Sequence, residues 1–188
     1  MGIESEKMRT FASLLASQGP SLGLIGPKEA ERVWERHIEN CATLAPFIEK
    51  AGAKSVVDVG SGAGLPGVVL AILLPTVRFT LLEPRALRKN WLDRMKKELD
   101  LENADIFKLK AEQWKGSKFD AAVCRALSPL PLLPSLLFPL VRSGGGVFAL
   151  KGKSAAEEMK GVEGARLFCV RQEDGEETRV VSLPVRRR

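Results

Sequence analysis

Ser55-Val-Val-Asp-Val-Gly-Ser-Gly-Ala-Gly-Leu-Pro-Gly67 is the part of the sequence that decides the fold. The β-branched run from Val56 to Val59 predicts a buried strand, and the alternating glycines from Gly60 to Gly64 predict a tight loop after it. The apolar run from Val68 to Leu74 predicts a helix. Because a strand, a glycine loop and a helix in this order let the backbone approach a nucleotide-like cofactor closely, we expect a cofactor site here.

Two kinds of cofactor compete for this loop. Gly62-Ala-Gly64-Leu-Pro-Gly67 matches the dinucleotide fingerprint G-x-G-x-x-G, in which a pyrophosphate lies against the loop. The carboxylate of Asp58 would repel a pyrophosphate but suits S-adenosyl-L-methionine, which carries a sulfonium and an ammonium. Pro66 also removes one backbone donor for an anion. We therefore favour S-adenosyl-L-methionine, with Asp58, Gly60 and Gly62 as binding residues, over a dinucleotide and over a glycine turn that binds nothing.

Alternating strands and helices follow the loop. We predict strands near residues 55–59, 77–82, 105–109, 119–124 and 146–150, and helices near residues 66–74, 86–99, 129–142 and 154–162. This alternation predicts an α/β fold, a mostly parallel sheet with helices on both faces. Asp174-Gly175 lies between two strand-like runs and predicts a C-terminal antiparallel hairpin. The combination favours a Rossmann-like class I S-adenosylmethionine-dependent methyltransferase fold over a dinucleotide dehydrogenase.

The first fifty residues differ from the rest. We predict a short helix at residues 4–16 and a long helix from Lys28 to Lys50, bent or broken at Pro46. We therefore expect an N-terminal helical extension at residues 1–50 and a single compact methyltransferase domain at residues 51–188. A chain of 188 residues can form one domain with a core of its own.

Composition narrows the class of protein. No apolar run is long enough to cross a bilayer, and the start has no signal-peptide apolar region, so we expect a cytoplasmic protein without a membrane partner. Cys41, Cys124 and Cys169 form no C-x-x-C pair, and His37 is the only histidine. We therefore expect no metal site, cysteines that pack as small core residues, and a monomer.

Positive charge is the strongest compositional signal for a partner. The formal net charge is +6 and the pI is about 9.4. Basic residues gather at Arg85–Lys89, Arg94–Lys97, Lys108–Lys118 and Arg186–Arg188. Each group alone is typical of a solvated surface, but together they make RNA or DNA a candidate partner.

Acidic and small residues after the second and third predicted strands are further cofactor candidates. Glu83 ends the second strand at the distance expected for a carboxylate that accepts hydrogen bonds from ribose hydroxyls. Ala111-Glu112 follows the third strand, where the backbone could contact an adenine edge. The alternatives are a helix-terminal acid for Glu83 and a surface residue for Glu112.

Basic residues follow the next two strands. Arg125 comes directly after an apolar strand, so its charge needs a partner. It could hold a cofactor carboxylate or a substrate phosphate, or form an internal salt bridge with Asp58 or Glu83. Lys151 could contact a substrate phosphate or be solvated. His37 lies on an apolar helix stripe, where a packed, hydrogen-bonded side chain is more common than a general base.

Seven motifs together resemble one known family. They are Arg36-His37-Ile38, Asp58 to Gly67, Leu81-Leu-Glu83, Ala111-Glu112, Phe119-Asp120, Cys124-Arg-Ala126 and Leu150-Lys-Gly152. With these, the sequence from about Arg32 onward resembles the RsmG (GidB) family of small-subunit ribosomal RNA methyltransferases. One departure is that the family's Trp…Asn-Leu-Thr segment is missing, and the loop from Pro20 to Pro27 stands in its place.

The resemblance implies transfer of a methyl group from S-adenosyl-L-methionine to N7 of one guanine in small-subunit ribosomal RNA, either as free RNA or in a 30S particle. It implies cofactor contacts at Gly60, Leu65, Ala111, Glu112 and Arg125, with Glu83 as the acid after the second strand. The candidate RNA-binding residues are Arg36, His37, Lys151 and Lys153. Arg125, Lys151 and His37 are the catalytic candidates. The alternatives are a class I methyltransferase with another substrate, or a cofactor-binding protein that has lost catalysis.

Overall fold

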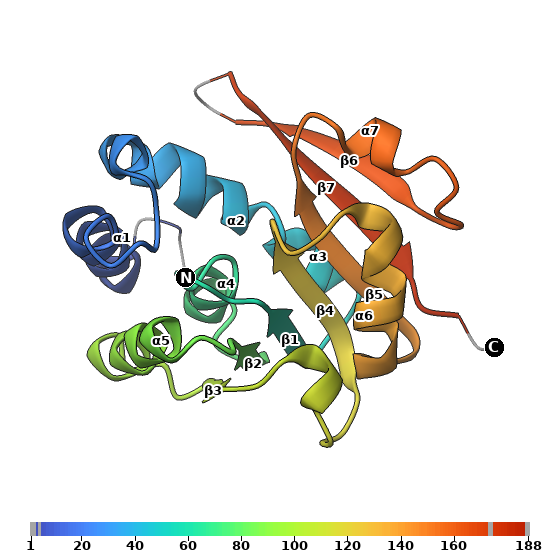
Figure 1. Ribbon diagram of the computed structural model, residues 1–188, viewed down its shortest axis with the longest axis horizontal. Coiled ribbons are helices and arrows are strands. Elements are labelled where there is room, and N and C mark those ends of the chain that lie inside the picture. The colour runs from blue at the N-terminus through green and yellow to red at the C-terminus, as the bar shows by residue number, and fades with distance from the viewer. Residues whose placement is uncertain (1–2, 4, 173–174, 187–188) are drawn as a thin grey trace.

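The structure is a computed structural model that describes residue 3, residues 5–172 and residues 175–186. Within these residues, seven strands form one sheet in the order β3-β2-β1-β4-β5-β7-β6 (Figure 1). The strands are β1 (Ser55–Val59), β2 (Arg78–Leu82), β3 (Ala104–Phe107), β4 (Phe119–Arg125), β5 (Val141–Lys151), β6 (Arg166–Arg171) and β7 (Glu177–Pro184). Strands β1 to β5 are parallel, and β7 pairs antiparallel with both β5 and β6. The mostly parallel sheet and the antiparallel hairpin are confirmed.

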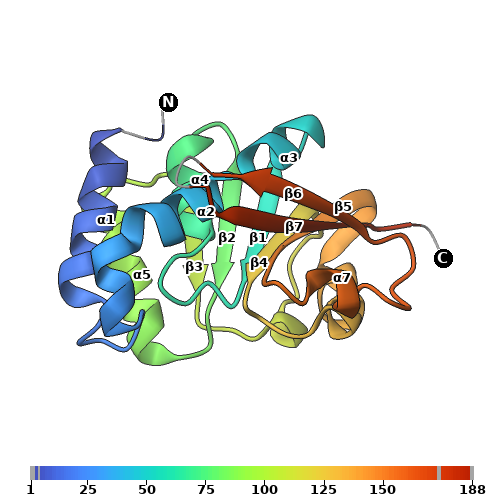
Figure 2. The ribbon, with the colours of Figure 1, turned by 90° about the horizontal axis from the view of Figure 1, so that it is seen from above.

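Helices cover both faces of the sheet, as predicted, and they are longer on one face. The first face carries α1 (Glu6–Gln18), η1 (Pro27–Arg32), η2 (Trp34–Glu39), α2 (Asn40–Ala42), α3 (Ala45–Lys50), α4 (Gly67–Leu73) and α5 (Ala86–Glu98). The second face carries η3 (Ala111–Gln113), η4 (Leu130–Leu132), α6 (Leu133–Leu137), η5 (Phe138–Leu140) and α7 (Ala155–Glu158). Figure 2 shows α1 and α5 on the left and α7 on the right.

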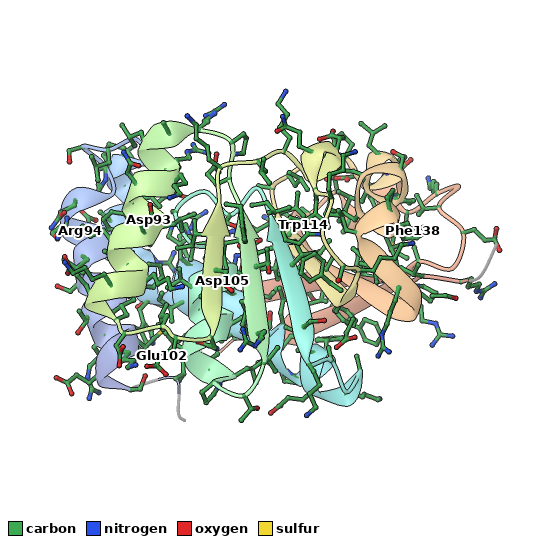
Figure 3. The ribbon with its side chains drawn as sticks, turned by 90° about the horizontal axis from the view of Figure 1, so that it is seen from below. Asp93, Arg94, Glu102, Asp105, Trp114 and Phe138 are labelled. Carbon is green, nitrogen blue, oxygen red and sulfur yellow. The ribbon has the colours of Figure 1, made fainter. Side chains whose placement is uncertain are left out.

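Alternating residues of β1 explain the two layers. Val56 belongs to the hydrophobic cluster of the first face and Val57 to that of the second, because successive side chains of a strand point to opposite faces. The first cluster also contains Met8 of α1, so the N-terminal helix packs into the core of the sheet. On the second face, Trp114 packs against Phe107 with ring centroids 5.3 Å apart. Trp114 is labelled in Figure 3. The predicted division at residue 50 stays a prediction.

Two predicted helices are divided into shorter segments. The predicted break at Pro46 is confirmed, whereas the further division of residues 28–42 was not predicted. The segment from Lys28 to Lys50 forms a 3-10 turn, a π-helical turn and two short α-helices instead of one helix. Pro46 lies in the first turn of α3 and lacks the N–H that would continue the preceding helix. The segment from residue 129 to residue 142, which contains four prolines, is divided into η4, α6 and η5. Strand β5 already begins at Val141, and its register with β4 shifts after Phe119.

The amino ends of β1 and β4 are joined by a carboxylate. Oδ2 of Asp120 accepts the backbone N–H groups of Lys54 at 2.7 Å and Ser55 at 2.9 Å. The hydroxyl of Ser55 accepts the N–H of Asp120 at 3.1 Å. These bonds hold the two neighbouring strands together at the edge opposite their carboxyl ends.

Three further sequence expectations concern the hairpin turn, the cysteines and membrane-spanning helices. The hairpin signal Asp174 lies outside the described residues, whereas the two strands that flank it pair from Arg171 and Glu177 onward. Cys41 and Cys124 are buried, but Cys169 is exposed on β6, so its predicted place in the core is wrong. Across the described ranges, every helix is too short or too polar to span a bilayer.

Candidate functional site

The glycine loop begins at the carboxyl end of β1, where the strand order reverses between β1 and β4. Ligands of open α/β sheets bind at such a reversal. Gly60, Gly62 and Gly64 have φ angles of 72°, 56° and 95°, which side chains adopt only with strain. A Cβ on Gly60 would lie 2.9 Å from Cδ1 of Leu127. The three glycines are therefore required by the path of the loop.

Asp58 lies beneath the loop and is completely buried. Its Oδ2 accepts the N–H of Gly67 at 3.0 Å, and its Oδ1 has no hydrogen-bond partner among the described residues. Burial raises the pKa of Asp58 to about 7. The choice of cofactor depends on the negative charge of Asp58, and near neutral pH this carboxyl group is only partly ionised in the free protein. A bound cation would favour its ionised form.

Glu83 connects β2 with the glycine loop. Its Oε2 accepts the N–H of Gly62 at 3.0 Å, and its Oε1 accepts the N–H of Arg85 at 2.8 Å. Each carboxylate oxygen can accept a further hydrogen bond, so the pair can still receive two hydroxyl groups. The loop is also held from α5, where the indole N–H of Trp91 donates to the carbonyl of Ala63 at 3.0 Å.

A cleft of about 310 Å³ opens beside the loop, and we call it the glycine-loop cleft. Its lining residues are Val59, Gly60, Leu82, Glu83, Pro84, Arg85, Arg88, Leu109, Ala111, Ala126, Leu127 and Leu136. The structure thus brings three predicted cofactor residues, Gly60, Glu83 and Ala111, into one cleft.

A second cleft of about 250 Å³ lies between η2 and the ends of β4, β5 and β7, and we call it the arginine cleft. It is lined by Glu35, Arg36, Asn40, Arg125, Ala126, Leu150, Lys151, Gly152, Gln172, Glu176, Glu177 and Thr178. Three of the predicted basic residues, Arg36, Arg125 and Lys151, therefore share this cleft.

Arg125 joins the end of β4 to the N-terminal segments. It donates from Nη2 to the carbonyl of Arg36 at 3.3 Å, and its Nη1 lies 3.7 Å from Sγ of Cys41. The alternative of an internal salt bridge with Asp58 or Glu83 is not found in the described residues. The guanidinium is therefore held by neutral groups, and its charge can be used by a ligand.

Ala126, which follows Arg125, is the residue common to both linings. Its φ is 48°, which is uncommon for a residue other than glycine, asparagine or aspartate. Backbone strain of this kind persists where the surroundings impose it, and it is frequent at functional sites. The two clefts therefore meet at the end of β4, where a group bound in one would face a group bound in the other.

Lys151 is already paired. Its Nζ lies 2.5 Å from Oε2 of Glu158 and donates to the carbonyl of Ser128 at 3.1 Å. The hydrogen bond from Lys151 lowers the pKa of Glu158 to about 2. The charge of Lys151 is therefore largely compensated within the protein.

His37 is buried behind the arginine cleft. Neither ring nitrogen has a hydrogen bond in the described structure, and Nε2 lies 3.7 Å from a carboxylate oxygen of Glu29. Burial lowers the pKa of His37 to about 4, so the ring is neutral at neutral pH. The side chain packs in the core, but the hydrogen bond expected for such a packed histidine is missing.

The remaining predicted residues do not line a cleft. Gly62 and Leu65 belong to the loop itself, and Glu112 and Lys153 are exposed. The sequence analysis did not propose several cleft residues, and among them are Arg85, Arg88, Leu127 and Leu136 of the glycine-loop cleft. The two arginines belong to a basic group that the sequence does show, whereas nothing in the local pattern distinguishes the two leucines.

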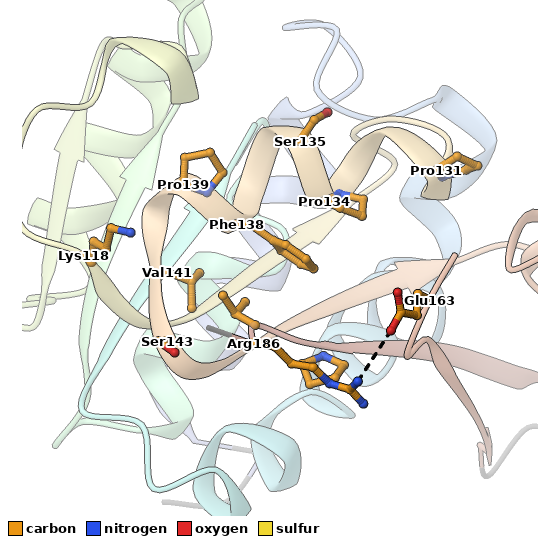
Figure 4. A pocket seen from close by; sticks show the side chains of 12 residues that line it. Lys118, Pro131, Pro134, Ser135, Phe138, Pro139, Val141, Ser143, Glu163 and Arg186 are labelled. Atoms are coloured by element: carbon orange, nitrogen blue, oxygen red, sulfur yellow. Dashed lines mark ion pairs between the residues drawn. The ribbon is translucent and has the colours of Figure 1, made fainter. Parts of the chain in front are cut away.

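A larger hollow lies elsewhere. It has a volume of about 1040 Å³ and lies on the second face between α6 and the end of β7, with Phe138 and several prolines in its wall (Figure 4). It shares no residue with the two clefts. Among the described residues, no three His, Cys, Asp or Glu side chains form a group that could hold a metal ion.

Comparison with known proteins identifies similar chains. A family model described as GidB, rRNA small subunit methyltransferase G, matches residues 4–181. The chain is 45% identical over 151 residues to the ribosomal RNA small subunit methyltransferase G of Thermobifida fusca, covering 80% of this chain and 63% of that protein. The protein of the same name from Leifsonia xyli is 47% identical over 154 residues, with 81% and 72% covered.

A solved structure supports the fold. The SAM-dependent O-methyltransferase from Thermotoga maritima superposes with a TM-score of 0.59 at 16% identity, covering 80% of this chain and 66% of that one. The predicted methyltransferase-type α/β architecture is thereby confirmed.

Proposed function

The chain belongs to the rRNA small subunit methyltransferase G family, and on this premise we propose that it transfers a methyl group from S-adenosyl-L-methionine to N7 of a guanine in small-subunit ribosomal RNA. The observation that carries the proposal is the meeting of two clefts at Ala126. One lies beside the glycine loop, and the other is lined by polar and charged side chains, with Arg125 at its junction with the first. A transfer between two bound molecules needs two adjoining sites of this kind.

The glycine-loop cleft fits the proposed cofactor. Glu83 offers two oxygens to ribose hydroxyls, and Ala111 is small enough for an adenine to lie close to the backbone. The unpartnered Oδ1 of Asp58 is a buried acceptor beneath the loop, and its negative charge is favoured by a cation. The cofactor would supply an electrophilic methyl group.

The arginine cleft fits a nucleotide as the acceptor. N7 of guanine has a free lone pair and carries no proton, so the reaction needs no general base, and the neutral, buried His37 is not required as one. The work of the chain is then to align two bound molecules and to exclude water. N7 faces the deep major groove of paired RNA, so the target guanine would have to be splayed out or lie in a loop.

Labelled methyl transfer tests the proposal. Wild-type protein would be incubated with labelled S-adenosyl-L-methionine and either 30S particles or naked small-subunit RNA, and the modified base would be mapped. N7-methylguanine at one position is expected. A methyl group on another atom would contradict the N7 assignment, and transfer only to small molecules or proteins would contradict the RNA assignment. Cofactor binding without transfer to any acceptor would indicate a protein that has lost catalysis.

A further inference from the structure

Two arginines in the wall of the glycine-loop cleft have no ion-pair partner among the described residues. Arg85 and Arg88 both line the cleft, and Nη1 of Arg88 lies 3.7 Å from the position that a Cβ on Gly62 would take. Neither arginine has a carboxylate within ion-pair distance in the part of the chain that the structure describes. Three of the four later cations of the same helix are paired, namely Lys89 with Asp93, Arg94 with Glu98 and Lys96 with Asp105. The fourth, Lys97, is exposed in the last turn.

The stability of helix α5 does not explain these two charges. Arg85 is the N-cap residue of α5, and the first turn contains no acid. Because the N-terminus of a helix carries a partial positive charge, cations there oppose the helix dipole. The proposed cofactor carries a single carboxylate beside its positive sulfonium and ammonium, so it can pair with at most one of the arginines. The two guanidinium groups therefore call for an anion from outside the chain.

Two lysines extend the same positive surface. Lys108 and Lys110 are exposed directly after β3, and the N–H of Glu83 donates to the carbonyl of Phe107 at 3.1 Å, which places the ends of β2 and β3 side by side. Neither lysine has an ion pair among the described residues. Two acids lie near, but both oxygens of Glu83 accept backbone N–H groups, and Glu112 is exposed. We call Arg85, Arg88, Lys108 and Lys110 the basic rim.

We propose that the basic rim binds the phosphodiester backbone of the RNA substrate, next to the nucleotide that enters the arginine cleft. This inference rests on the proposed function and specifies which surface holds the RNA. Guanidinium groups bind phosphate oxygens in a bidentate manner, and lysine acts as a point charge, so the rim matches a chain of phosphates. Phosphate contacts fix the position of a nucleic acid without reading its sequence. The rim would therefore orient the RNA and leave base selection to the arginine cleft.

The salt dependence of RNA binding tests the inference. The affinity for a single-stranded fragment of small-subunit RNA would be measured at several salt concentrations for the wild type and for two double variants, Arg85→Ala/Arg88→Ala and Lys108→Ala/Lys110→Ala. Each lost phosphate contact lowers the slope of log affinity against log salt by about 0.7 to 1. We expect each double variant to lose between about one and two units of slope and to bind several-fold more weakly at low salt.

A matched control removes the same charge elsewhere. Arg78 begins β2 and Lys97 lies in the last turn of α5, so both are at the opposite edge of the sheet, exposed and without an ion pair in the described structure. The variant Arg78→Ala/Lys97→Ala is expected to keep the wild-type slope. Circular dichroism of all variants would show that the fold is retained.

The outcomes separate this inference from the proposed function. The inference that the basic rim binds RNA would be overturned if both rim variants kept the wild-type slope. It would also be overturned if the control variant lost as much slope as the rim variants. Either result would hold even if the wild type methylates 30S particles. Lowered slopes in the rim variants would support the rim even if no methyl transfer is found. Binding of the wild type to anionic lipid vesicles but not to RNA would assign the surface to a different partner and overturn the inference. Neither Lys108 nor Lys110 lines the glycine-loop cleft, although Leu109 between them does. Calorimetry on Lys108→Ala/Lys110→Ala should therefore give unchanged cofactor affinity.

Discussion

The two clefts are built in different ways. The glycine-loop cleft is shaped by backbone: positive φ angles turn the loop at Gly60, and the carboxylate of Glu83 is bound by two backbone N–H groups. The arginine cleft is shaped by side chains from distant segments, because Arg125 reaches η2 and Asn40 donates to Thr178 of β7 at 2.7 Å. We therefore expect changes in the first cleft to act on cofactor affinity and changes in the second to act on turnover.

The largest expected effect comes from a side chain on the glycine loop. Gly60→Val places a β-branched residue at a φ of 72° and a Cβ 2.9 Å from Leu127. Left-handed backbone costs about 1–2 kcal/mol and overpacking about 1–3 kcal/mol, so we expect cofactor affinity to fall by at least about 30-fold. Calorimetry with S-adenosyl-L-methionine measures this. Unchanged affinity for S-adenosyl-L-methionine would show that the glycine loop is not part of the cofactor site.

A control distinguishes strain from obstruction. Gly52 has a φ of 61°, but a Cβ there would have no neighbour within 4 Å. Gly52→Ala should lower the free energy of unfolding by about 1–2 kcal/mol and leave cofactor affinity unchanged. Gly60→Ala should lower both. If the two alanine variants had equal effects on cofactor affinity, the claim that the glycine-loop cleft binds the cofactor would be contradicted.

In the arginine cleft, we expect Arg125→Ala to lower turnover on small-subunit RNA by about 10- to 100-fold, because a misplaced reactant has effects of this size. Its two internal contacts are long, at 3.3 and 3.7 Å, so the free energy of unfolding should change by less than about 1 kcal/mol. Arg125→Lys keeps the charge but not the planar geometry and should recover only part of the turnover. Single-turnover kinetics with denaturant unfolding measure both. Wild-type turnover in Arg125→Ala would contradict a role in the site.

Asp58 makes a pH-dependent prediction. Burial raises its pKa to about 7 from 3.8, so the unfolded chain ionises at lower pH than the folded one. The contribution of Asp58 to the free energy of unfolding is therefore fully present below pH 4 and is lost as the pH rises from about 4 to 7. Cofactor affinity should rise over the same range, because a cationic ligand favours the ionised form.

Asp58→Asn is expected to remove this pH dependence and to weaken cofactor binding severalfold. Asp58→Ala should weaken binding further, because it also leaves the N–H of Gly67 without its acceptor. Urea unfolding and calorimetry at pH 5 and pH 7 measure the two effects. A wild type whose stability and affinity do not vary between these pH values would show that Asp58 is ionised throughout.

The smallest expected effect concerns Lys151 and Glu158. The hydrogen bond from Lys151 lowers the pKa of Glu158 to about 2 from 4.5, so this stabilisation is present above pH 4.5 and is lost as the pH falls towards 2. Lys151→Met should lower the free energy of unfolding at pH 7 by about 1–2 kcal/mol, because a partly buried carboxylate loses its partner. Thermal unfolding at pH 7 and pH 3 measures this, and the difference between the two proteins should shrink at pH 3. A large loss of turnover with unchanged stability would instead assign the lysine to the substrate.

The sequence predicted several residues of the glycine-loop cleft, because this cleft depends on local backbone geometry. The order of strand, glycines and helix places Asp58, Gly60 and Glu83 at the ends of adjacent strands, and periodicity is sufficient to recognise those strands. It predicted the break at Pro46 but could not predict that residues 28–42 divide into a 3-10 turn, a π-helical turn and a short α-helix, because these divisions depend on how the turns pack against the sheet. It also could not show that Asn40 and Thr178 meet, since 138 positions separate them and neither belongs to a local pattern.

The place of β7 between β5 and β6 has a consequence for synthesis of the chain. Strand β6 is translated before β7, but in the sheet it is hydrogen-bonded only to β7. Until residues 177–184 leave the ribosome, β6 has no strand to pair with and one edge of β5 is unpaired. Unpaired strand edges can form hydrogen bonds with other nascent chains and lead to aggregation. A chain truncated before Glu177 should therefore aggregate more readily than the full chain.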